Sequence, residues 1–293
     1  MKEKEIIALG FFDGVHLGHQ ALLKACVDLA EQQNMTTAAI TFHRHPRSLF
    51  AGSVPLLLNS LEDRCRLLER YGMSQVIIVP VSPQVMEMPW QDFLATLLAD
   101  GAGGFVCGED FRFGRRGEGN AQLLEGYCRE RNLSCVIVPD QKLDGVRISS
   151  THIRSLMEAG EMEEAVRFLG HSHVLSGQVI PGQQLGRKIG IPTANLVISP
   201  GVLVPKFGVY ACRITTDQGE FSAVTNVGTR PTVAGNGITV EPWILDFSGD
   251  LYGKTVILEF HKFLRPEKKF ATLEDLQAEI RKNAAQTRKF FAE

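Results

Sequence analysis

Apolar residues recur along the chain with two different periods, and the change between them divides the sequence. In the first 170 residues, short apolar runs alternate with segments that have the 3.6-residue period of amphipathic helices. This alternation is typical of a parallel sheet with crossover helices. We expect strands at 5–10, 36–42, 75–81, 104–108 and 134–139, with helices at 18–33, 60–71, 89–99 and 120–131 between them.

The segment 150–170 predicts two short helices, broken at Gly160 and ended at Gly170. Beyond it, strand-like runs follow one another closely and are separated by Gly, Pro and Asp, which predicts an antiparallel barrel or sandwich. A last helix is expected at about 272–291. We therefore predict an α/β domain over 1–170 and an antiparallel barrel domain with a C-terminal helix over 171–293. The strands expected in the second domain are 173–180, 193–198, 208–215, 220–228, 238–247 and 255–264.

The composition indicates a globular protein and gives no sign of a nucleic-acid-binding, membrane-spanning or disulfide-rich one. The 293 residues are 44% hydrophobic and 22% charged, with a formal net charge of −2, as in globular proteins with buried cores. No basic tail or cationic helix suggests nucleic acid, and no apolar stretch is long enough to suggest a membrane span. The six cysteines are scattered and form no Cys-x-x-Cys pair, which favours reduced thiols over a disulfide or zinc framework. A cytoplasmic location is expected, since no signal peptide precedes the first strand.

The stretch "GFFDGVHLGH" at 10–19 is the first candidate site. It places His16 and His19 where a predicted strand turns into a predicted helix, with Gly14 and Gly18 beside them. The free N–H groups at a helix N-terminus favour anions, and two small glycines let a nucleotide approach the backbone, so a phosphate site is one interpretation. An ordinary turn that contains histidine and a metal site are the alternatives. A metal would need further ligands, for which the candidates are Asp13, His43 and His45.

A second stretch, "VRISSTHIR" at 146–154, also precedes a predicted helix. It offers the hydroxyls of Ser150 and Thr151 and the guanidinium groups of Arg147 and Arg154. The structural alternative is a hydroxyl N-cap followed by solvent-facing arginines. Two such motifs at opposite ends of one α/β domain favour phosphate binding.

Together the two stretches resemble the His-x-Gly-His and Ile-Ser-Ser-Thr-x-x-Arg motifs of the nucleotidylyltransferase superfamily. More narrowly, they resemble the FMN adenylyltransferase half of bacterial bifunctional riboflavin kinase/FAD synthetases. The resemblance implies a Rossmann-like nucleotidylyltransferase domain in which His16 and His19 hold the ATP phosphates and stabilise charge at the α-phosphorus. It also implies that four residues cradle the triphosphate and the departing pyrophosphate: Arg147, Ser150, Thr151 and Arg154.

The loop "GEDFRFGRRGEGN" at 108–120 matches the flavin side of that family. The resemblance assigns flavin contacts to Asp110, Phe111 and Phe113, and aromatic faces can stack on a planar ring. A core phenylalanine beside a solvated basic turn is the structural alternative. The sequence departs from the family at "FHRHP", 42–46, where His43 and Arg44 replace an acid and a proline.

In the second half, "PGQQLGRKIGIPTANL" at 181–196 resembles the riboflavin kinase signature Gly-x-Pro-Thr-Ala-Asn; by itself it could be a glycine-rich hairpin. The resemblance implies that Thr193 and Asn195 contact Mg²⁺ and ATP phosphates, since hydroxyl and amide oxygens suit this hard cation. It makes Glu241 the base for the ribityl hydroxyl, although a lone glutamate in a strand is usually solvent-facing. Gly186 and Arg265 are the further candidates for ATP or flavin contact.

Two departures accompany this second match. Pro242 and Trp243 follow the glutamate where relatives carry other residues, and Pro242 lacks a backbone donor, which predicts a strand edge or a bulge there. Asn283 stands in the last helix where relatives often have Asp.

The sequence thus predicts a two-step enzyme that phosphorylates riboflavin to FMN with Mg-ATP and adenylylates FMN to FAD. Its partners would be riboflavin, FMN and ATP, and it would be a monomer or a weak homo-oligomer. Two alternatives stay open at this stage. The chain could be a nucleotidylyltransferase for another phosphorylated acceptor, or a flavin-binding regulator or storage protein without turnover.

Overall fold

A computed structural model describes residues 4–49, 54–182, 186, 190–232 and 235–292. Its contacts divide the chain into two compact units, Met1–Leu57 with Leu61–Ser150, and Leu58–Ser60 with Thr151–Glu293. We call them the sheet unit and the barrel unit. The contacts therefore group the helices after Ser150 with the barrel, whereas the predicted boundary at residue 170 groups them with the sheet. The boundary between the two activities stays a prediction.

The sheet unit is a five-stranded parallel sheet in the order β3-β2-β1-β4-β7, which confirms the predicted α/β class. Its strands lie within one residue or two of the predicted ranges, because each is an apolar run bounded by turn residues. The strands are β1 (Glu5–Leu9), β2 (Thr36–Phe42), β3 (Gln75–Val79), β4 (Ala102–Gly108) and β7 (Ser134–Val138).

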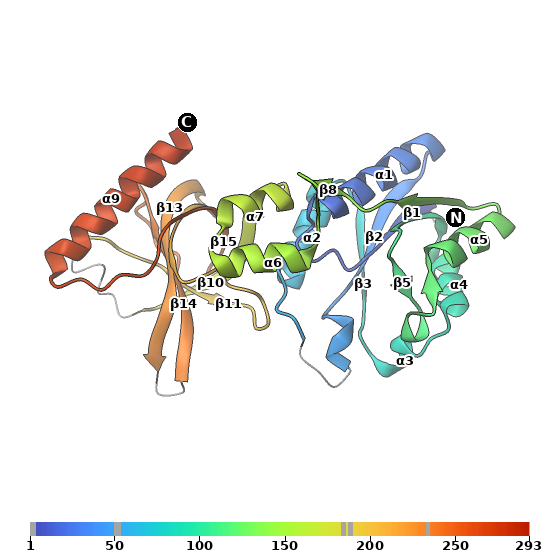
Figure 1. Ribbon diagram of the computed structural model, residues 1–293, viewed down its shortest axis with the longest axis horizontal. Helices are drawn as coiled ribbons and strands as arrows, with labels where there is room; N and C mark the ends of the chain where they lie inside the picture. The colour runs from blue at the N-terminus through green and yellow to red at the C-terminus, as the bar shows by residue number, and fades with distance from the viewer. Residues whose placement is uncertain (1–3, 50–53, 183–185, 187–189, 233–234, 293) are drawn as a thin grey trace. The chain divides into compact units, whose positions relative to one another are not determined.

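Helices cover both faces of this sheet. The helices α1 and α2 lie on one side, and α4 and α5 on the other, as right-handed crossovers require (Figure 1). The central strand is buried on both faces, so Ile7 and Leu9 join Phe105 and Cys107 in the core. The helices are α1 (Leu17–Gln33), α2 (Leu61–Arg70), α3 (Pro83–Met86), α4 (Trp90–Asp100) and α5 (Ala121–Glu130).

Short elements extend the loops at the carboxyl ends of the strands. Two hairpins form, one within the predicted flavin loop and one before the second phosphate motif. The strand order reverses between β1 and β4, and ligands of open α/β sheets bind outside the carboxyl ends of the strands at such a point. The short elements are η1 (Pro46–Leu49), η2 (Arg115–Gly117), β5 (Arg112–Phe113), β6 (Gly119–Asn120), β8 (Lys142–Leu143) and β9 (Val146–Arg147).

The barrel unit contains a closed antiparallel barrel in the order β10-β11-β14-β13-β12-β15 and the C-terminal helix α9 (Leu273–Ala292), as predicted. Two helices precede the barrel, α6 (Ser150–Ala159) and α7 (Met162–Leu169), separated by Gly160 in the left-handed region. Helix α9 packs against β12 and β13. The strands are β10 (His173–Ile180), β11 (Asn195–Ile198), β12 (Gly208–Thr216), β13 (Gly219–Thr232), β14 (Gly235–Ile244) and β15 (Thr255–Arg265).

Pro242 lies neither at an open edge nor at a bulge. It pairs with Thr225 of β13 in an uninterrupted register, and β14 has β11 on its other side. The Pro242 carbonyl accepts a hydrogen bond from the Ala194 amide, just before β11 begins. The missing N–H therefore faces the place where the neighbouring strand starts, and the closed barrel tolerates the proline there.

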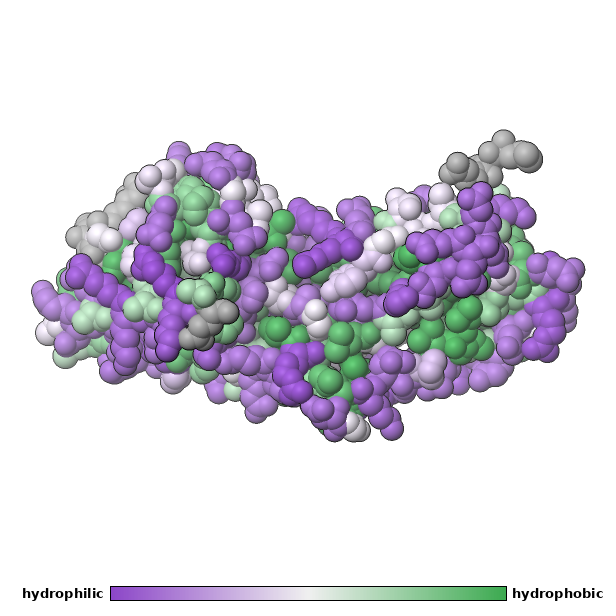
Figure 2. Space-filling model, turned by 90° about the horizontal axis from the view of Figure 1, so that it is seen from above, coloured by the Kyte–Doolittle hydropathy of each residue, from purple (hydrophilic) through white to green (hydrophobic). Residues whose placement is uncertain are grey.

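Hydrophilic residues cover most of the face shown in Figure 2. Across the part of the chain that the structure describes, no helix is long and apolar enough to cross a membrane. The six cysteines are free thiols, four of them buried.

Candidate nucleotide and flavin sites

The turn after β1 has a strained backbone. Phe12 and Val15 have φ angles of 58° and 40°, and Gly14 has a φ of 85°. A β-branched valine in the left-handed region is a clear outlier, and strain of this kind concentrates at functional sites. Phe12 and Val15 are both fully buried, so the surrounding core holds the turn in this form.

His16 caps helix α1. Its Nδ1 accepts a hydrogen bond from the His19 amide at 3.3 Å, so the neutral ring carries its proton on Nε2. Gly18 leaves room for this ring, since a Cβ at position 18 would lie 3.2 Å from Nδ1 of His16. The rings of His16 and His19 stack with centroids 3.7 Å apart and planes 12° apart. The motif thus presents two parallel imidazoles at a helix N-terminus whose first turn has no acidic residue.

His19 has a lowered pKa. Burial lowers it well below the ordinary value of 6.5, and the charges of His16 and Arg64 lower it further. Its ring packs edge-on against Phe12 at 5.3 Å, and among the described residues its buried Nδ1 has no hydrogen-bond partner. The ring is therefore neutral near pH 7.

The second phosphate motif reaches this turn through Ser150. Its hydroxyl donates to the carbonyl of Asp13 at 2.8 Å, across 137 residues of sequence. Thr151 and Arg154 follow on α6, beyond the last residue of the sheet unit, and their contact with a phosphate stays a prediction. Within the described ranges, no group of three or more His, Cys, Asp and Glu side chains could hold a metal, so the metal interpretation of His16 and His19 lacks further ligands.

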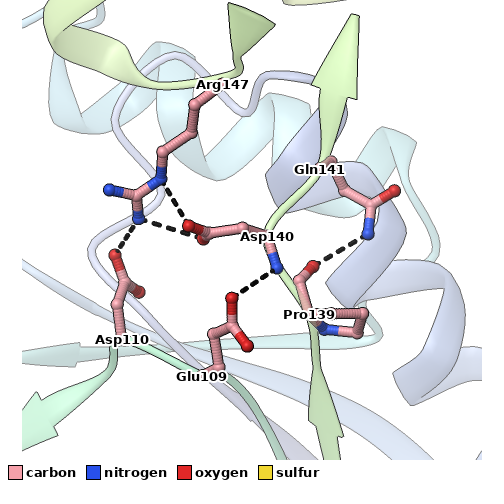
Figure 3. Close-up of polar contacts among 6 residues, drawn as sticks. All are labelled: Glu109, Asp110, Pro139, Asp140, Gln141 and Arg147. Atoms are coloured by element: carbon pink, nitrogen blue, oxygen red, sulfur yellow. Dashed lines mark hydrogen bonds and ion pairs between the residues drawn. The ribbon is translucent and has the colours of Figure 1, made fainter. Parts of the chain in front are cut away.

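Arg147 is held by two carboxylates (Figure 3). Its Nε lies 2.6 Å from Asp140 Oδ2, and its Nη2 donates to Asp140 Oδ1 at 3.0 Å and to Asp110 Oδ2 at 2.5 Å. The backbone amide of Asp140 in turn donates to Glu109 at 3.1 Å. These carboxylates raise the pKa of Arg147. One predicted phosphate ligand and one predicted flavin ligand, Arg147 and Asp110, are thus joined by an ion pair.

Phe111 and Phe113 stack on each other, with centroids 5.5 Å apart. Phe113 is 7% exposed and packs against Trp90 and Phe93, which fits the structural alternative of a core phenylalanine. Phe111 is only half-buried. The flavin contacts of both rings stay predictions, and Phe111 has the more accessible ring.

The departure at 42–46 has a structural explanation. His43 Nδ1 accepts a hydrogen bond from the Val81 amide at 2.9 Å, and Arg44 donates to the Val81 carbonyl at 3.1 Å. His45 packs edge-on against Phe11 at 5.1 Å. His43 and Arg44 therefore connect this loop by hydrogen bonds to the segment after β3.

A cavity of about 470 Å³ lies in the barrel unit. Glu241 lines it together with Thr239 and Trp243, because alternate residues of β14 share one face. Asn226, the register partner of Glu241 on β13, lines it too, and sequence reasoning did not single it out. Asn226 could have been found only from its pairing with Glu241 across the antiparallel ladder, which the sequence does not show. All the candidates of the second site also line this cavity: Gly186, Thr193, Asn195 and Arg265.

Two described glycines of the stretch 181–196, Gly182 and Gly186, are closely packed. The Gly186 carbonyl accepts a hydrogen bond from the Ile191 amide at 2.8 Å, and a side chain at position 186 would collide with the Ile191 carbonyl. A side chain at Gly182 would collide in the same way with the amide of Asn195. The oxygens of Thr193 and Asn195 are a donor set that fits Mg²⁺.

Asn283, the residue of α9 that departs from the family pattern, makes a hydrogen bond with Arg265. Arg265 Nε donates to Asn283 Oδ1 at 3.1 Å, and Asn283 Nδ2 donates to Gln286 at 3.2 Å. Burial lowers the pKa of Arg265, while the carboxylate of Glu279, 3.8 Å from Nε, opposes this shift. Asn283 therefore orients the arginine at the wall of the cavity.

A smaller cavity of about 220 Å³ adjoins the first. Thr193 lines both of them. Apolar and aromatic side chains such as Val179, Phe247 and Tyr252 form much of the smaller cavity, and Pro192 completes it next to Thr193.

Two family models match consecutive parts of the chain. The FAD synthetase model matches residues 1–152, and the riboflavin kinase model matches residues 169–291. The chain belongs to the bifunctional riboflavin kinase/FMN adenylyltransferase family. The relative from Listeria monocytogenes is 36% identical over 98% of this chain and 93% of its own length. The relative from Escherichia coli is 34% identical over 98% of this chain and 92% of its own length.

A solved structure from Streptococcus pneumoniae, described as a macrolide-efflux protein, has the same fold. It aligns with a TM-score of 0.88 at 30% identity and covers 98% of this chain and 95% of that one. The family models and the curated relatives agree on flavin chemistry, and the family assignment rests on them.

Proposed function

We propose that this chain converts riboflavin into FAD in two ATP-dependent steps at two separate sites. The barrel cavity phosphorylates the ribityl hydroxyl of riboflavin, and the histidine turn of the sheet unit transfers an adenylyl group to FMN. The observation that supports this most strongly is the match of the two family models, each over the half of the chain that contains one of the sites.

In the adenylyl step, His16 and His19 donate hydrogen bonds to ATP phosphates. The neutral His16 ring has its proton on Nε2, since Nδ1 accepts the helix amide. Gly14 and Gly18 keep the backbone accessible, and the N-terminus of α1 adds its dipole. These groups stabilise the charge that develops at the α-phosphorus.

An FMN phosphate oxygen attacks the α-phosphorus in line, and the bond to the pyrophosphate oxygen breaks. The protein supplies position and charge and no nucleophile. Ser150, Thr151 and Arg154 bind the triphosphate and the leaving pyrophosphate. Arg147 joins them by exchanging its exposed carboxylate partners for phosphate, an inexpensive exchange because exposed ion pairs contribute at most about 1 kcal/mol. Asp110 and Phe111 then face the flavin.

In the kinase step, Glu241 accepts the proton of the ribityl hydroxyl as that oxygen attacks the γ-phosphorus; the bond from the γ-phosphorus to the β–γ bridging oxygen breaks, and ADP leaves. Thr193 and Asn195 hold Mg²⁺ and the phosphates, and the metal supplies charge neutralisation when it is bound. The adenine fits the smaller apolar cavity that meets the main one at Thr193. The flavin ring then takes the apolar part of the main cavity, beside Val224, Trp243 and Ile280.

One assay tests the whole proposal. Purified protein is incubated with riboflavin, ATP and Mg²⁺, and riboflavin, FMN and FAD are separated by chromatography. We expect FMN to appear first and FAD to follow. Binding of flavin without turnover would favour a regulator or storage protein instead, and adenylylation of another phosphorylated acceptor in preference to FMN would favour a different nucleotidylyltransferase.

The same preparation tests the remaining expectations. We propose that the enzyme acts in the cytoplasm on small molecules, as a monomer or weak homo-oligomer, and that both steps need Mg²⁺. EDTA should stop both steps, and excess Mg²⁺ should restore them. Sedimentation at several protein concentrations gives the oligomeric state.

A further inference from the structure

Arg64 on α2 is a fully buried arginine in the sheet unit, with 0% of its surface exposed. Arginine is almost never fully buried unless it is paired. Its Nη2 donates to the Phe42 carbonyl at 2.5 Å, and its guanidinium lies 4.4 Å from the centre of the Phe11 ring. It therefore connects the end of β2 with the start of the turn that contains the histidines.

The protein leaves much of this guanidinium without partners. Among the described residues, neither Nε nor Nη1 of Arg64 has a hydrogen-bond partner. Burial lowers the pKa of Arg64, and the charge of Asp13, which is itself buried, partly opposes this shift. A buried cation with two unsatisfied nitrogens destabilises the fold, and groups of this kind are retained where a function needs them.

Arg64 lies against the same short turn as the imidazoles. Phe11, which it contacts, is followed by Phe12, whose ring packs on His19. Besides burial, the groups that lower the His19 pKa are the N-cap His16 and Arg64 from α2, and of these two Arg64 has the permanent charge. Both of them oppose a proton on His19.

We infer that Arg64 is a positioning residue of the adenylyl-transfer site: it holds the histidine turn in place and supplies a fixed positive charge behind His19. A histidine cation would lose its charge as the pH rises through neutrality, whereas an arginine keeps its charge. The site therefore attracts phosphate equally over the physiological range, and His19 serves as a neutral donor. The inference rests on the proposed role of this turn in ATP binding.

The test replaces Arg64 by neutral residues, which removes its positive charge, and by lysine, which keeps a positive charge. Arg64→Met and Arg64→Gln are neutral, Arg64→Lys keeps the charge, and Arg66→Met is the matched control. Arg66 lies two residues along the same helix, is 46% exposed and pairs with Asp63 at 3.0 Å. FMN adenylylation (kcat and KM for ATP) is measured from pH 6 to pH 8 and expressed relative to the unmodified protein, so that substrate ionisation cancels. Circular dichroism and thermal unfolding of the same samples report whether the sheet unit, which contains Arg64, is folded.

Burial is the largest cause of the lowered His19 pKa and Arg64 is the smallest of the three, so without Arg64 this pKa rises only in part and His19 does not replace the missing charge. We expect the neutral variants to lose about 30-fold in kcat/KM for ATP at both pH 6 and pH 8. Arg64→Lys should stay within about fivefold of the unmodified protein at every pH, and Arg66→Met should be unchanged. An NMR titration of the His19 ring should show the raised pKa only in the neutral variants.

The inference fails if Arg64→Lys is as impaired as Arg64→Met, or if the His19 pKa is the same in Arg64→Met as in the unmodified protein. Arg64 would then act through packing alone. If Arg64→Met does not fold, Arg64→Gln decides the matter by the same two measurements. The proposed role of the turn fails separately, if replacing both His16 and His19 leaves FMN adenylylation intact.

Discussion

The two sites bind phosphate compounds with different parts of the chain. In the sheet unit, a strained turn, a helix N-terminus and two stacked imidazoles lie within eight consecutive residues, from Phe12 to His19. In the barrel unit, the residues that line the cavity come from several strands and from α9. The first candidate site combines a special backbone geometry with two imidazoles, and the N-terminus of a helix favours anions. The second depends on side chains that alternate along strands.

This comparison predicts that each site can be destroyed without affecting the other. The largest effect should come from replacing both His16 and His19 by Ala, which removes two donors at the α-phosphorus. We expect FMN adenylylation to fall by about 10³-fold or more, with FMN accumulating from riboflavin at the normal rate. Chromatography of the products measures both. A comparable fall in kinase activity, in a variant with an unchanged melting temperature, would mean that the sites are not independent.

The converse change is Glu241→Gln in the barrel cavity. The amide keeps the shape of the side chain and cannot accept the hydroxyl proton, so the kinase step should fall by about 10²- to 10³-fold. FAD formation from supplied FMN should continue at the normal rate. Asn226→Asp, on the strand paired with Glu241, is a useful companion, because it adds a carboxylate beside the base without removing it. Normal phosphorylation by Glu241→Gln would show that this carboxylate is not the base.

A smaller change tests how closely the first site depends on its backbone. Gly18→Ala places a methyl group about 3.2 Å from Nδ1 of His16, so the ring must shift by a few tenths of an ångström. We expect adenylylation to fall by about tenfold and the kinase step to be unchanged. Gly126→Ala on α5 is the matched control, since its Cβ meets nothing within 4 Å. The control should stabilise the protein by about 0.5–1 kcal/mol in thermal unfolding, with both activities unaltered.

The smallest effect is expected from Asn283→Asp, which restores the residue that relatives often have. The new carboxylate can still accept from Arg265 Nε, and the Gln286 amide can rotate to donate to it. We expect the KM for riboflavin to change by less than about threefold. A change of tenfold or more would show that the neutral amide tunes the charge of Arg265.

Most of the fold could be predicted from local patterns. Each parallel strand is an apolar run long enough to cross a sheet, and each barrel strand ends at turn residues, so their bounds follow from the sequence. Pro242 shows where this reasoning stops. A proline inside a strand pattern indicated an edge or a bulge, yet the closed barrel places its missing N–H beside the start of β11.

The sites could be predicted only in part. Spacing and resemblance indicated His16, His19, Thr193 and Glu241, because these residues stand in short motifs, and their roles stay predictions. Asn226 could not be found, since its role depends on pairing with Glu241 across the barrel. For Phe113, the family resemblance assigned a flavin contact. The structure packs this ring against Trp90 and Phe93, and its flavin contact stays a prediction.

By itself, the sequence determined the order and type of the elements, the position of the histidine turn and the family to which the chain belongs. These features depend on periodicity and on motifs of a few adjacent residues. The tertiary structure alone decided which distant groups meet, such as Arg147 with Asp110 and Arg64 with Phe11. The physical reason is that charge pairing and burial depend on distances in space, and residues far apart in sequence come within such distances only when the chain has folded.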